Sequence, residues 1–137
     1  MRYVLDTNVV CSVMRGEPVV LDRLKRTNRR DALLPQPVLA ELAYGIARLP
    51  KSHRRQLLQD RFDLITSHFE RVDWTDAVSL AFGDIKAFFE RKGRRIEDFD
   101  AAIAAHALAN EATLVTANVK HMGGVPDLVL EDWVTER

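Results

Sequence analysis

The chain has 137 residues, with 20 Lys and Arg against 20 Asp and Glu, and 47% of its residues are hydrophobic. This is the size and composition of one globular domain, and it excludes a disordered chain, a collagen-like chain and a strongly basic nucleic-acid coat. A single cysteine, Cys11, excludes an internal disulfide and a cysteine-based zinc cluster. The longest uncharged runs, 32–40 and 101–110, are too short to span a membrane, and no signal peptide is visible. We expect a soluble, cytoplasmic protein of one domain, residues 1–137.

The net charge of zero conceals an uneven distribution of charged residues. Residues 1–96 hold 18 basic and 12 acidic residues, whereas residues 97–137 hold 2 basic and 8 acidic residues. Fourteen of the basic residues lie in three windows, 23–30, 48–61 and 91–95. Each window is typical either of a solvated helix face or of a basic rim that faces an anionic partner.

Short apolar runs alternate with helical patterns in the first half of the chain. We predict strands at residues 3–5 and 32–34, a helix that begins at Pro18 and a helix from Pro37 to Pro50. These prolines suit the first turn or the end of a helix because proline has no backbone N–H to donate. Apolar residues 57, 58, 62 and 65 recur at helical spacing and predict a further helix.

The same alternation continues in the second half. We predict a weak strand at residues 70–73, then a helix with Thr75 as its N-cap that ends at Gly93. A helix follows from Asp98 or Phe99, then strands at residues 113–116 and 128–130. The whole pattern predicts about five strands and six or seven helices in one α/β domain, with a mainly parallel sheet flanked by helices.

Polar residues from four segments are expected at one edge of this sheet, because ligands of open α/β sheets bind outside the carboxyl ends of the strands. Asp6 ends the first strand, and Thr116 and Asn118 follow the fourth. Glu41 lies one turn into a helix, and Asp100 lies in the first turn of another. Converging carboxylates repel one another, and a hard divalent cation such as Mg²⁺ or Mn²⁺ would offset that repulsion.

Each of these residues also has a purely structural interpretation. Asp6 is a suitable cap for a loop, and Asn118 is a typical turn residue. Glu41 alone is typical of a solvated glutamate. Asp98 and Asp100 both suit a helix N-terminus, where the helix dipole favours anions, and only one of them should face the site because residues two apart diverge.

Four segments of the sequence together resemble a known family. They are residues 3–8 (Tyr-Val-Leu-Asp-Thr-Asn), 37–45 (Pro-Val-Leu-Ala-Glu-Leu-Ala-Tyr-Gly), 98–107 (Asp-Phe-Asp-Ala-Ala-Ile-Ala-Ala-His-Ala) and 114–121 (Leu-Val-Thr-Ala-Asn-Val-Lys-His). In this order they resemble the PIN-domain ribonucleases, most closely the VapC toxins of bacterial toxin–antitoxin pairs. In the third segment the family's ligand is the aspartate three residues before Ile-Ala-Ala, which selects Asp100 over Asp98.

The resemblance implies a three-layer PIN-like fold and an Mg²⁺- or Mn²⁺-dependent endoribonuclease. Asp6, Glu41 and Asp100 would hold the metal, Thr116 and Asn118 would orient water or metal-bound ligands, and Thr7 and Asn8 would support the turn at Asp6. Metal-activated water would cleave the RNA phosphodiester bond and leave a 5′-phosphate and a 3′-hydroxyl, with no histidine needed as general base. The family's fourth acidic position is often aspartate, so Asn118 implies one firmly held metal ion and a second recruited with the substrate.

The resemblance also implies partners. VapC-like toxins usually form homodimers through helices and are neutralised by a cognate antitoxin whose tail lies across the site. The three basic windows would hold the RNA backbone, and the window 91–95, just before Asp100, is the first to test.

Residues on the helix of Asp100 bear on that role. Ala104 and Ala107 lie within about 40° of Asp100 around the helix, at 100° per residue, so the helix can approach the sheet closely there. His106 points to another side and is expected to be a core or surface residue rather than a metal ligand.

Two other classes of protein remain alternatives. A haloacid-dehalogenase-like phosphatase also uses an aspartate at a strand end, but it needs a second aspartate where this chain has Asn8. A non-catalytic RNA-binding or regulatory module on a PIN fold is compatible with Asn118. Cleavage of RNA with Mg²⁺ or Mn²⁺, and its loss with EDTA, would distinguish the enzyme from the binding module.

Overall fold

Five short strands form one parallel sheet in the computed structural model, which describes residues 1–135. They are β1 (Tyr3–Leu5), β2 (Ala32–Pro35), β3 (Glu70–Val72), β4 (Thr113–Val115) and β5 (Leu130–Glu131). The order across the sheet is β3-β2-β1-β4-β5, and every neighbouring pair is parallel. The predicted α/β class and the predicted number of strands are therefore confirmed.

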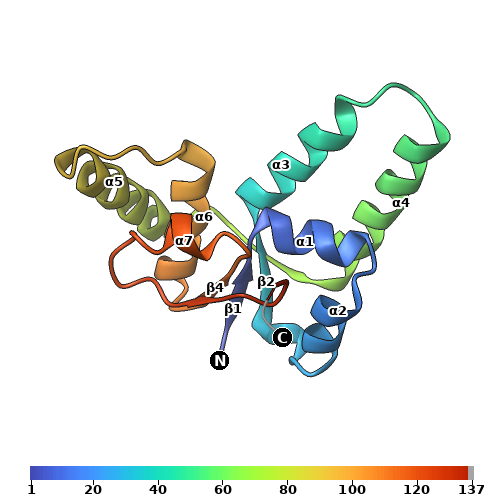
Figure 1. Ribbon diagram of the computed structural model, residues 1–137, viewed down its shortest axis with the longest axis horizontal. Helices are drawn as coiled ribbons and strands as arrows, with labels where there is room; N and C mark the ends of the chain where they lie inside the picture. The colour runs from blue at the N-terminus through green and yellow to red at the C-terminus, as the bar shows by residue number, and fades with distance from the viewer. Residues whose placement is uncertain (136–137) are drawn as a thin grey trace.

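Helices connect the strands and fill most of the rest of the chain (Figure 1). They are α1 (Thr7–Met14), α2 (Pro18–Lys25), the short 3₁₀ turn η1 (Arg29–Asp31), α3 (Gln36–Ala47), α4 (His53–His68), α5 (Asp76–Arg91), α6 (Asp98–Ala109) and α7 (Val119–Met122). Figure 1 shows two arms that rise from the sheet, one made by α3 and α4 and the other by α5 and α6. Within residues 1–135, no helix combines the length and the apolar character that crossing a membrane requires.

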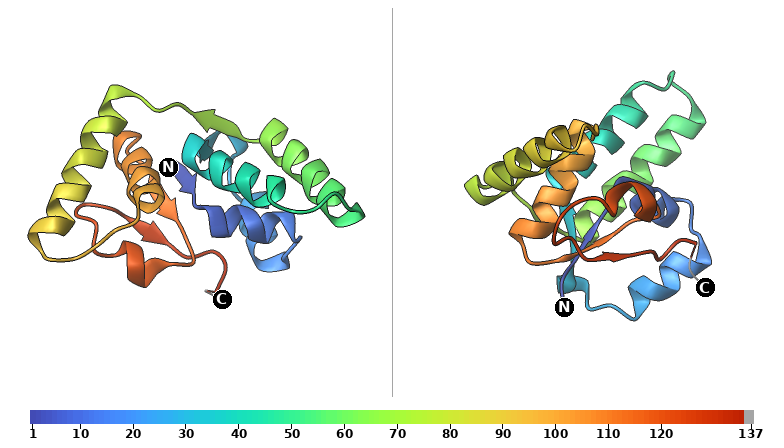
Figure 2. Two further views of the ribbon diagram at one scale, coloured as in Figure 1. Left: turned by 90° about the horizontal axis from the view of Figure 1, so that it is seen from above. Right: turned by 60° about the vertical axis from the view of Figure 1, so that its left-hand side comes forward.

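The strand order places helices on both faces of the sheet. The chain moves outward from β1 to β2 and β3, and then returns to the other side of β1 to form β4 and β5. Because parallel crossovers are right-handed, this reversal sends the two sets of connecting helices to opposite faces. In Figure 2, α5 and α6 lie on one side of the strands and α1, α3 and α4 lie on the other. The fold therefore has three layers, and the carboxyl ends of β1 and β4 flank its topological switch point.

Helix α6 packs closely on the sheet because its inward face is built from small residues. Ala104 and Ala107 are fully buried, and α6 contacts β1, β4 and the long helix α5. The close approach predicted from the alanines of this helix is confirmed. It carries Asp100, in the first turn of α6, toward the carboxyl edge of the sheet.

The structure confirms several predicted boundaries of helices. Pro18 is the first residue of α2, and the hydroxyl oxygen of Thr75 accepts a hydrogen bond from the backbone N–H of Val78 at the start of α5. Gly93, which follows α5, has a φ of +65°, a conformation that favours glycine. The proline, threonine and glycine in the sequence therefore predicted the starts of α2 and α5 and the end of α5 correctly.

Two predictions of local structure were wrong. No helix was predicted for residues 7–14, yet α1 begins immediately after β1, with Asp6 as its N-cap. The last strand was predicted at 128–130, but β5 lies at Leu130–Glu131 because Leu130 pairs with Leu114 of β4. Of the predicted domain 1–137, residues 136 and 137 lie outside the described part of the chain.

Candidate metal-dependent active site

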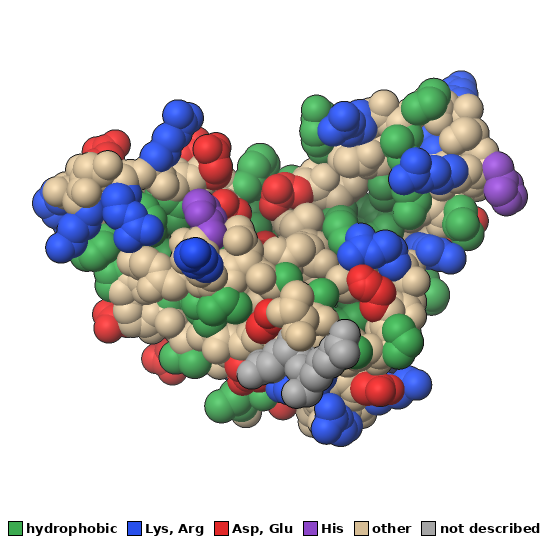
Figure 3. Space-filling model, in the orientation of Figure 1, with side chains coloured by type: hydrophobic (Ala, Val, Ile, Leu, Met, Phe, Trp, Pro, Cys, Tyr) green, Lys and Arg blue, Asp and Glu red, His purple; other side chains and the backbone are tan. Residues whose placement is uncertain are grey.

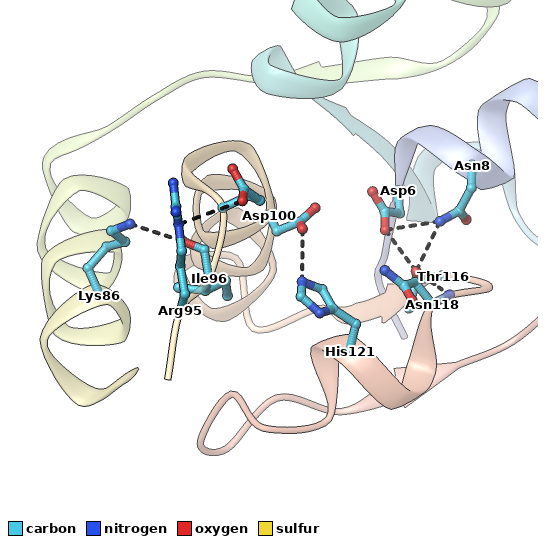
Figure 4. Close-up of polar contacts among 10 residues, drawn as sticks. Asp6, Asn8, Lys86, Arg95, Ile96, Asp100, Thr116, Asn118 and His121 are labelled. Atoms are coloured by element: carbon cyan, nitrogen blue, oxygen red, sulfur yellow. Dashed lines mark hydrogen bonds and ion pairs between the residues drawn. The ribbon is translucent and has the colours of Figure 1, made fainter. Parts of the chain in front are cut away.

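Asp6 is held at the switch point by two short hydrogen bonds. Its Oδ1 accepts a bond from the backbone N–H of Thr7 at 2.7 Å, and its Oδ2 accepts one from the hydroxyl of Thr116 at 2.7 Å. The first bond caps α1, and the second joins the end of β1 to the residue that follows β4 (Figure 4). Only 5% of Asp6 is exposed, so both of its carboxylate oxygens are fixed in a mainly buried position.

Asn8 and Thr116 complete a network around Asp6. The Oδ1 of Asn8 accepts a hydrogen bond from the backbone N–H of Ala117 at 3.0 Å, and the Thr116 hydroxyl oxygen accepts one from the backbone N–H of Asn118 at 3.0 Å. The amide nitrogen of Asn8 makes longer contacts of 3.4 Å with both Asp6 and Thr116. Because Thr116 is fully buried, its hydroxyl has a fixed orientation and donates its proton to Asp6.

Glu41 reaches the same edge of the sheet from α3. Its Oε1 accepts a hydrogen bond from the hydroxyl of Thr7 at 2.7 Å, so Glu41 is linked to the residue directly after Asp6. Leu42 and Ile46 of α3 are buried against the core, and this fixes the helix so that half-buried Glu41 lies along the sheet edge. Glu41 was predicted one turn into a helix after the second strand, and its place in α3 confirms that position.

Asp98 and Asp100 diverge at the start of α6. Asp98 is mostly exposed and pairs with Lys86 of α5 at 2.8 Å, and the Lys86 ammonium group lowers the pKa of Asp98. Asp100 points toward Asp6 instead and meets the Nε2 of His121, from α7, at 3.1 Å (Figure 4). The divergence expected for residues two apart on a helix is confirmed.

The three carboxylates of the site lie within one another's electrostatic fields. Burial raises the pKa of Asp6, and the charge of Asp100 raises it further against the opposing effect of the hydrogen bonds. Burial likewise raises the pKa of Glu41, as do the charges of Asp6 and Asp100. Negative charge gathered in this way makes the site favourable for a cation.

The donor atoms of this edge suit a hard metal ion in their chemistry. Carboxylate, hydroxyl and amide oxygens are the ligands that Mg²⁺ and Mn²⁺ prefer. Among residues 1–135, no three His, Cys, Asp or Glu side chains are grouped so that they could hold a metal ion together. Glu41 is turned to Thr7 and Asp100 to His121. Mg²⁺ usually takes only one or two carboxylates and keeps several waters, so the donor set still fits this ion.

Asn118 lies beside the site but is exposed. Within the described residues its backbone N–H makes the contact with Thr116, and no hydrogen bond of its side chain is found. The expected role of the Asn118 side chain in orienting water therefore stays a prediction.

The two histidines of the matched segments differ in environment. His106 is fully buried, its Nδ1 donates to the carbonyl of Ala102 at 2.7 Å, and its ring meets Trp74 edge-on at 5.4 Å. Burial lowers its pKa, and it is a core residue, as the sequence analysis allowed. The contact between His121 and Asp100 was missed, because nothing local relates residues that are 21 positions apart.

Comparisons with known proteins agree with this geometry. The family model described as PIN domain matches residues 3–121. The chain is 34% identical to Ribonuclease VapC2 of Rickettsia felis over 137 residues, which cover 97% of this chain and 98% of that protein. It is 27% identical to the tRNA(fMet)-specific endonuclease VapC of Shigella flexneri, with 97% of this chain and 98% of that protein covered.

A solved structure extends the similarity to three dimensions. The crystal structure of VapBC2 from Rickettsia felis bound to a DNA fragment from their promoter contains a chain that superposes with a TM-score of 0.87 and 31% identity. The superposition covers 98% of this chain and 100% of the other. Residues 6, 41, 100 and 116 all lie within the matched region, so the similarity includes the whole candidate site.

Proposed function

This chain belongs to the PIN domain family and, within it, to the VapC-like proteins, and on that basis we propose that it is a metal-dependent endoribonuclease toxin that a cognate antitoxin inhibits. The observation that supports the proposal is that Asp6, Glu41 and Asp100 come from three separate elements to the same region at the carboxyl edge of the sheet, Glu41 through its bond to Thr7 and Asp100 through its electrostatic effect on Asp6. The phosphatase alternative is not compatible with the family assignment. It also lacks its second aspartate, since position 8 is Asn8.

We propose that Asp6 and Asp100, with Glu41 beside them, hold Mg²⁺ or Mn²⁺. A bound divalent cation would offset the negative charge that grows on the phosphate during hydrolysis and would lower the pKa of the attacking water. Support comes from the raised pKa values of Asp6 and Glu41. Burial and, to a smaller extent, the neighbouring carboxylates disfavour their charged forms, and a bound cation would offset both effects.

The residues of the chain itself would perform the positioning. Thr116 and Asn8 hold the Asp6 carboxylate in one orientation, so that it does not have to reorganise when substrate arrives. Thr7 holds Glu41 in the same way. Asp100 has fewer contacts, and its bond to His121 can exchange for a bond to a ligand.

RNA is the substrate that the charge distribution favours. Figure 3 shows acidic side chains in the hollow between the two arms and Lys and Arg side chains on both arms around it. The Lys and Arg side chains of the arms would attract a polyanion electrostatically. A bound metal ion would offset the negative charge of the carboxylates in the hollow, so that a phosphate could bind there. The name of the Shigella flexneri relative makes tRNA the first class of RNA to test.

An antitoxin is the protein partner that we propose. An apolar hollow of about 510 Å³ lies between α2 and α4, and its lining includes Leu21, Leu24, Leu64 and Phe69. Leu64 is 68% exposed, so this surface would gain free energy from being covered by an apolar helix or strand. We further propose a homodimer, supported by the exposed Tyr44, Leu57 and Leu80 on the helices of the two arms. Light scattering of the isolated chain would test the dimer.

Asp100→Asn is the variant that tests the proposed activity. We expect the wild type to cleave bulk bacterial tRNA in the presence of Mg²⁺ or Mn²⁺, and we expect EDTA to abolish this cleavage. We expect Asp100→Asn to fold normally but not to cleave the tRNA. Asp98→Asn is the matched control, because Asp98 has the same charge two residues away and faces Lys86 instead of the site.

The two aspartate variants, purified identically, also reveal a contaminating nuclease, since a contaminant would cut in both. Cleavage by Asp100→Asn at the wild-type rate, with none of it due to a contaminant, would contradict the proposal. Binding of RNA by the wild type without any cleavage would favour the alternative, a non-catalytic module, to which Asn118 in place of a fourth acidic residue would contribute.

A further inference from the structure

The loop between α5 and α6 holds one arginine in an unusual position. The guanidinium of Arg94 lies 5.5 Å from the centre of the Phe89 ring. It also lies against Gly124, because a Cβ placed on that glycine would be only 3.1 Å from Nη1 of Arg94. Arg94 thus bridges the end of α5 to the loop that follows α7. The ring and the glycine restrict the guanidinium, although the residue as a whole is exposed.

This guanidinium has no acidic partner within residues 1–135. Four other basic residues are committed to structural contacts: Arg23 pairs with Glu131, Lys86 with Asp98, Arg55 bonds to the carbonyl of Leu49, and Arg61 bonds to the carbonyl of Met14. Its neighbour Arg95 is 89% exposed at the side chain and makes only a 3.9 Å contact with Glu97. Arg94 therefore combines a defined position with N–H donors that no protein carboxylate occupies.

Arg94 is connected to the acidic site through α7 and the loop that follows it. Gly124 follows α7, and His121 of α7 contacts Asp100. Arg94 also lines an open hollow of about 460 Å³, together with Lys86, Gly93 and Arg95. Glu90 lines the hollow as well, so it is not uniformly positive. Figure 3 shows basic side chains over this end of α5 on the same face as the acidic side chains of the hollow.

We propose that Arg94 is a phosphate-binding residue for the RNA backbone, and that it holds a phosphate on the Asp100 side of the site. The proposal rests on the proposed ribonuclease function and deepens it, since it selects one residue from the basic window 91–95. A planar guanidinium that presents several donors in a fixed fork is well suited to a phosphate group. Phe89 and Gly124 already restrict the position of the Arg94 guanidinium. The side chain therefore loses less conformational entropy when a phosphate binds.

The first test compares Arg94→Gln with Arg2→Gln. Both variants remove one positive charge, but Arg2 precedes β1 and lies at the opposite edge of the sheet from Asp6. With bulk bacterial tRNA and Mg²⁺, we expect Arg94→Gln to raise KM about fivefold with kcat nearly unchanged, as for a lost charge-assisted contact outside the reacting atoms. Arg2→Gln should leave both constants near their wild-type values.

A binding measurement tests, without requiring cleavage, whether Arg94 contacts a phosphate. A short fluorescein-labelled oligouridine is titrated against Asp100→Asn protein, with and without Arg94→Gln, over a range of salt concentrations. Loss of one phosphate contact should reduce the slope of log affinity against log salt by about 0.7 for a single strand. A folding defect alone would lower the active fraction and leave this slope unchanged.

Gly124→Ala provides a second variant that keeps every charge. The new methyl group would have to displace the Arg94 guanidinium by a few tenths of an ångström, since it would otherwise lie 3.1 Å away. We expect a smaller rise in KM, about twofold, with a normal thermal melt. An unchanged KM in this variant would contradict the proposed position of the guanidinium.

The outcomes separate the two proposals. Equal KM and equal salt slopes for Arg94→Gln and Arg2→Gln would overturn the subsite, even if the wild type cleaves RNA and Asp100→Asn does not. If the wild type cleaves no RNA, the proposed function fails, and the salt slope alone decides whether Arg94 contacts phosphate.

Discussion

The two sides of the acidic site are built in opposite ways. On the side of β1, Asp6 is mainly buried, and Thr7, Asn8 and Thr116 donate hydrogen bonds to its oxygens. On the side of α6, Asp100 is only partly buried, and within residues 1–135 the side chain that bonds to its carboxylate is that of His121. One carboxylate is fixed by the fold, and the other is held by a contact that a ligand can replace.

This difference separates two requirements of a cleavage site. A fixed carboxylate supplies a reference position that does not reorganise during the reaction. A carboxylate with few contacts can adjust when a metal ion and a phosphate arrive together. Burial raises the pKa values of Asp6 and Glu41, so these two carboxylates are not in their most favourable electrostatic environment as they stand. The stability of the fold therefore includes a cost that serves the site.

The largest change in stability is expected from Thr116→Val, on the fixed side. The substitution keeps the shape of the side chain but removes the bond to Asp6 and the acceptor for the Asn118 N–H. We expect the free energy of unfolding to fall by about 2 kcal/mol, because buried polar groups lose their partner. Urea denaturation would measure it. A loss near zero would mean that the network does not fix Asp6.

A metal ion is expected to stabilise the fold by a somewhat smaller amount. At Mg²⁺ or Mn²⁺ concentrations tenfold above the dissociation constant, the wild type should gain about 1.4 kcal/mol, seen as a rise in Tm. Asp100→Asn should reduce this gain much more than Asp98→Asn, since Asp98 faces Lys86. An equal gain in both variants would place the metal elsewhere.

Glu41→Gln is expected to stabilise the protein slightly when no metal is present. Because the pKa of Glu41 is raised from its ordinary 4.5, the native state holds this proton more tightly than the unfolded state does. Wild-type stability should therefore fall as pH rises from 4.5 through the raised value, whereas the glutamine does not titrate. The variant should therefore be slightly more stable than the wild type at pH 7 and should gain nothing from this source below pH 4.5. Thermal melts in EDTA across this range would show it.

The smallest effect is expected from His121→Ala on the adjustable side. The contact with Asp100 is partly exposed, so its loss should change the free energy of unfolding by less than about 0.5 kcal/mol. Measured beside Thr116→Val under the same denaturation conditions, this variant tests directly whether Asp6 is held more firmly than Asp100. A loss as large as that of Thr116→Val would show that both carboxylates are fixed to the same degree.

The sequence predicted those parts of the fold that local chemistry determines. The strands β1, β2 and β4 are apolar runs with clear ends, and Pro18 and Thr75 mark helix starts. Helix α1 was missed because it is rich in valine, whose intrinsic preference is for strands. It forms because Asp6 caps it and because Val9 and Val10 are buried.

The sequence indicated which residues would lie near the carboxyl edge of the sheet, but it did not indicate their contacts. The carboxyl edge and the resemblance both pointed to Asp6, Glu41 and Asp100 before any geometry was known. The pairing of Asp98 with Lys86 and the position of Arg94 against Gly124 depend on how α5, α6 and α7 pack. No local pattern encodes such packing, so these features required the structure.

The bond between Thr116 and Asp6 has a consequence for the synthesis of the protein. It joins residues 110 positions apart, across neighbouring strands that lie near opposite ends of the sequence. During synthesis, Asp6 cannot take up its final orientation until residue 116 has emerged from the ribosome and its hydroxyl can bond to the Asp6 carboxylate. The proposed catalytic centre can therefore form only after residue 116 has been synthesised and has left the ribosome, well after Asp6 itself.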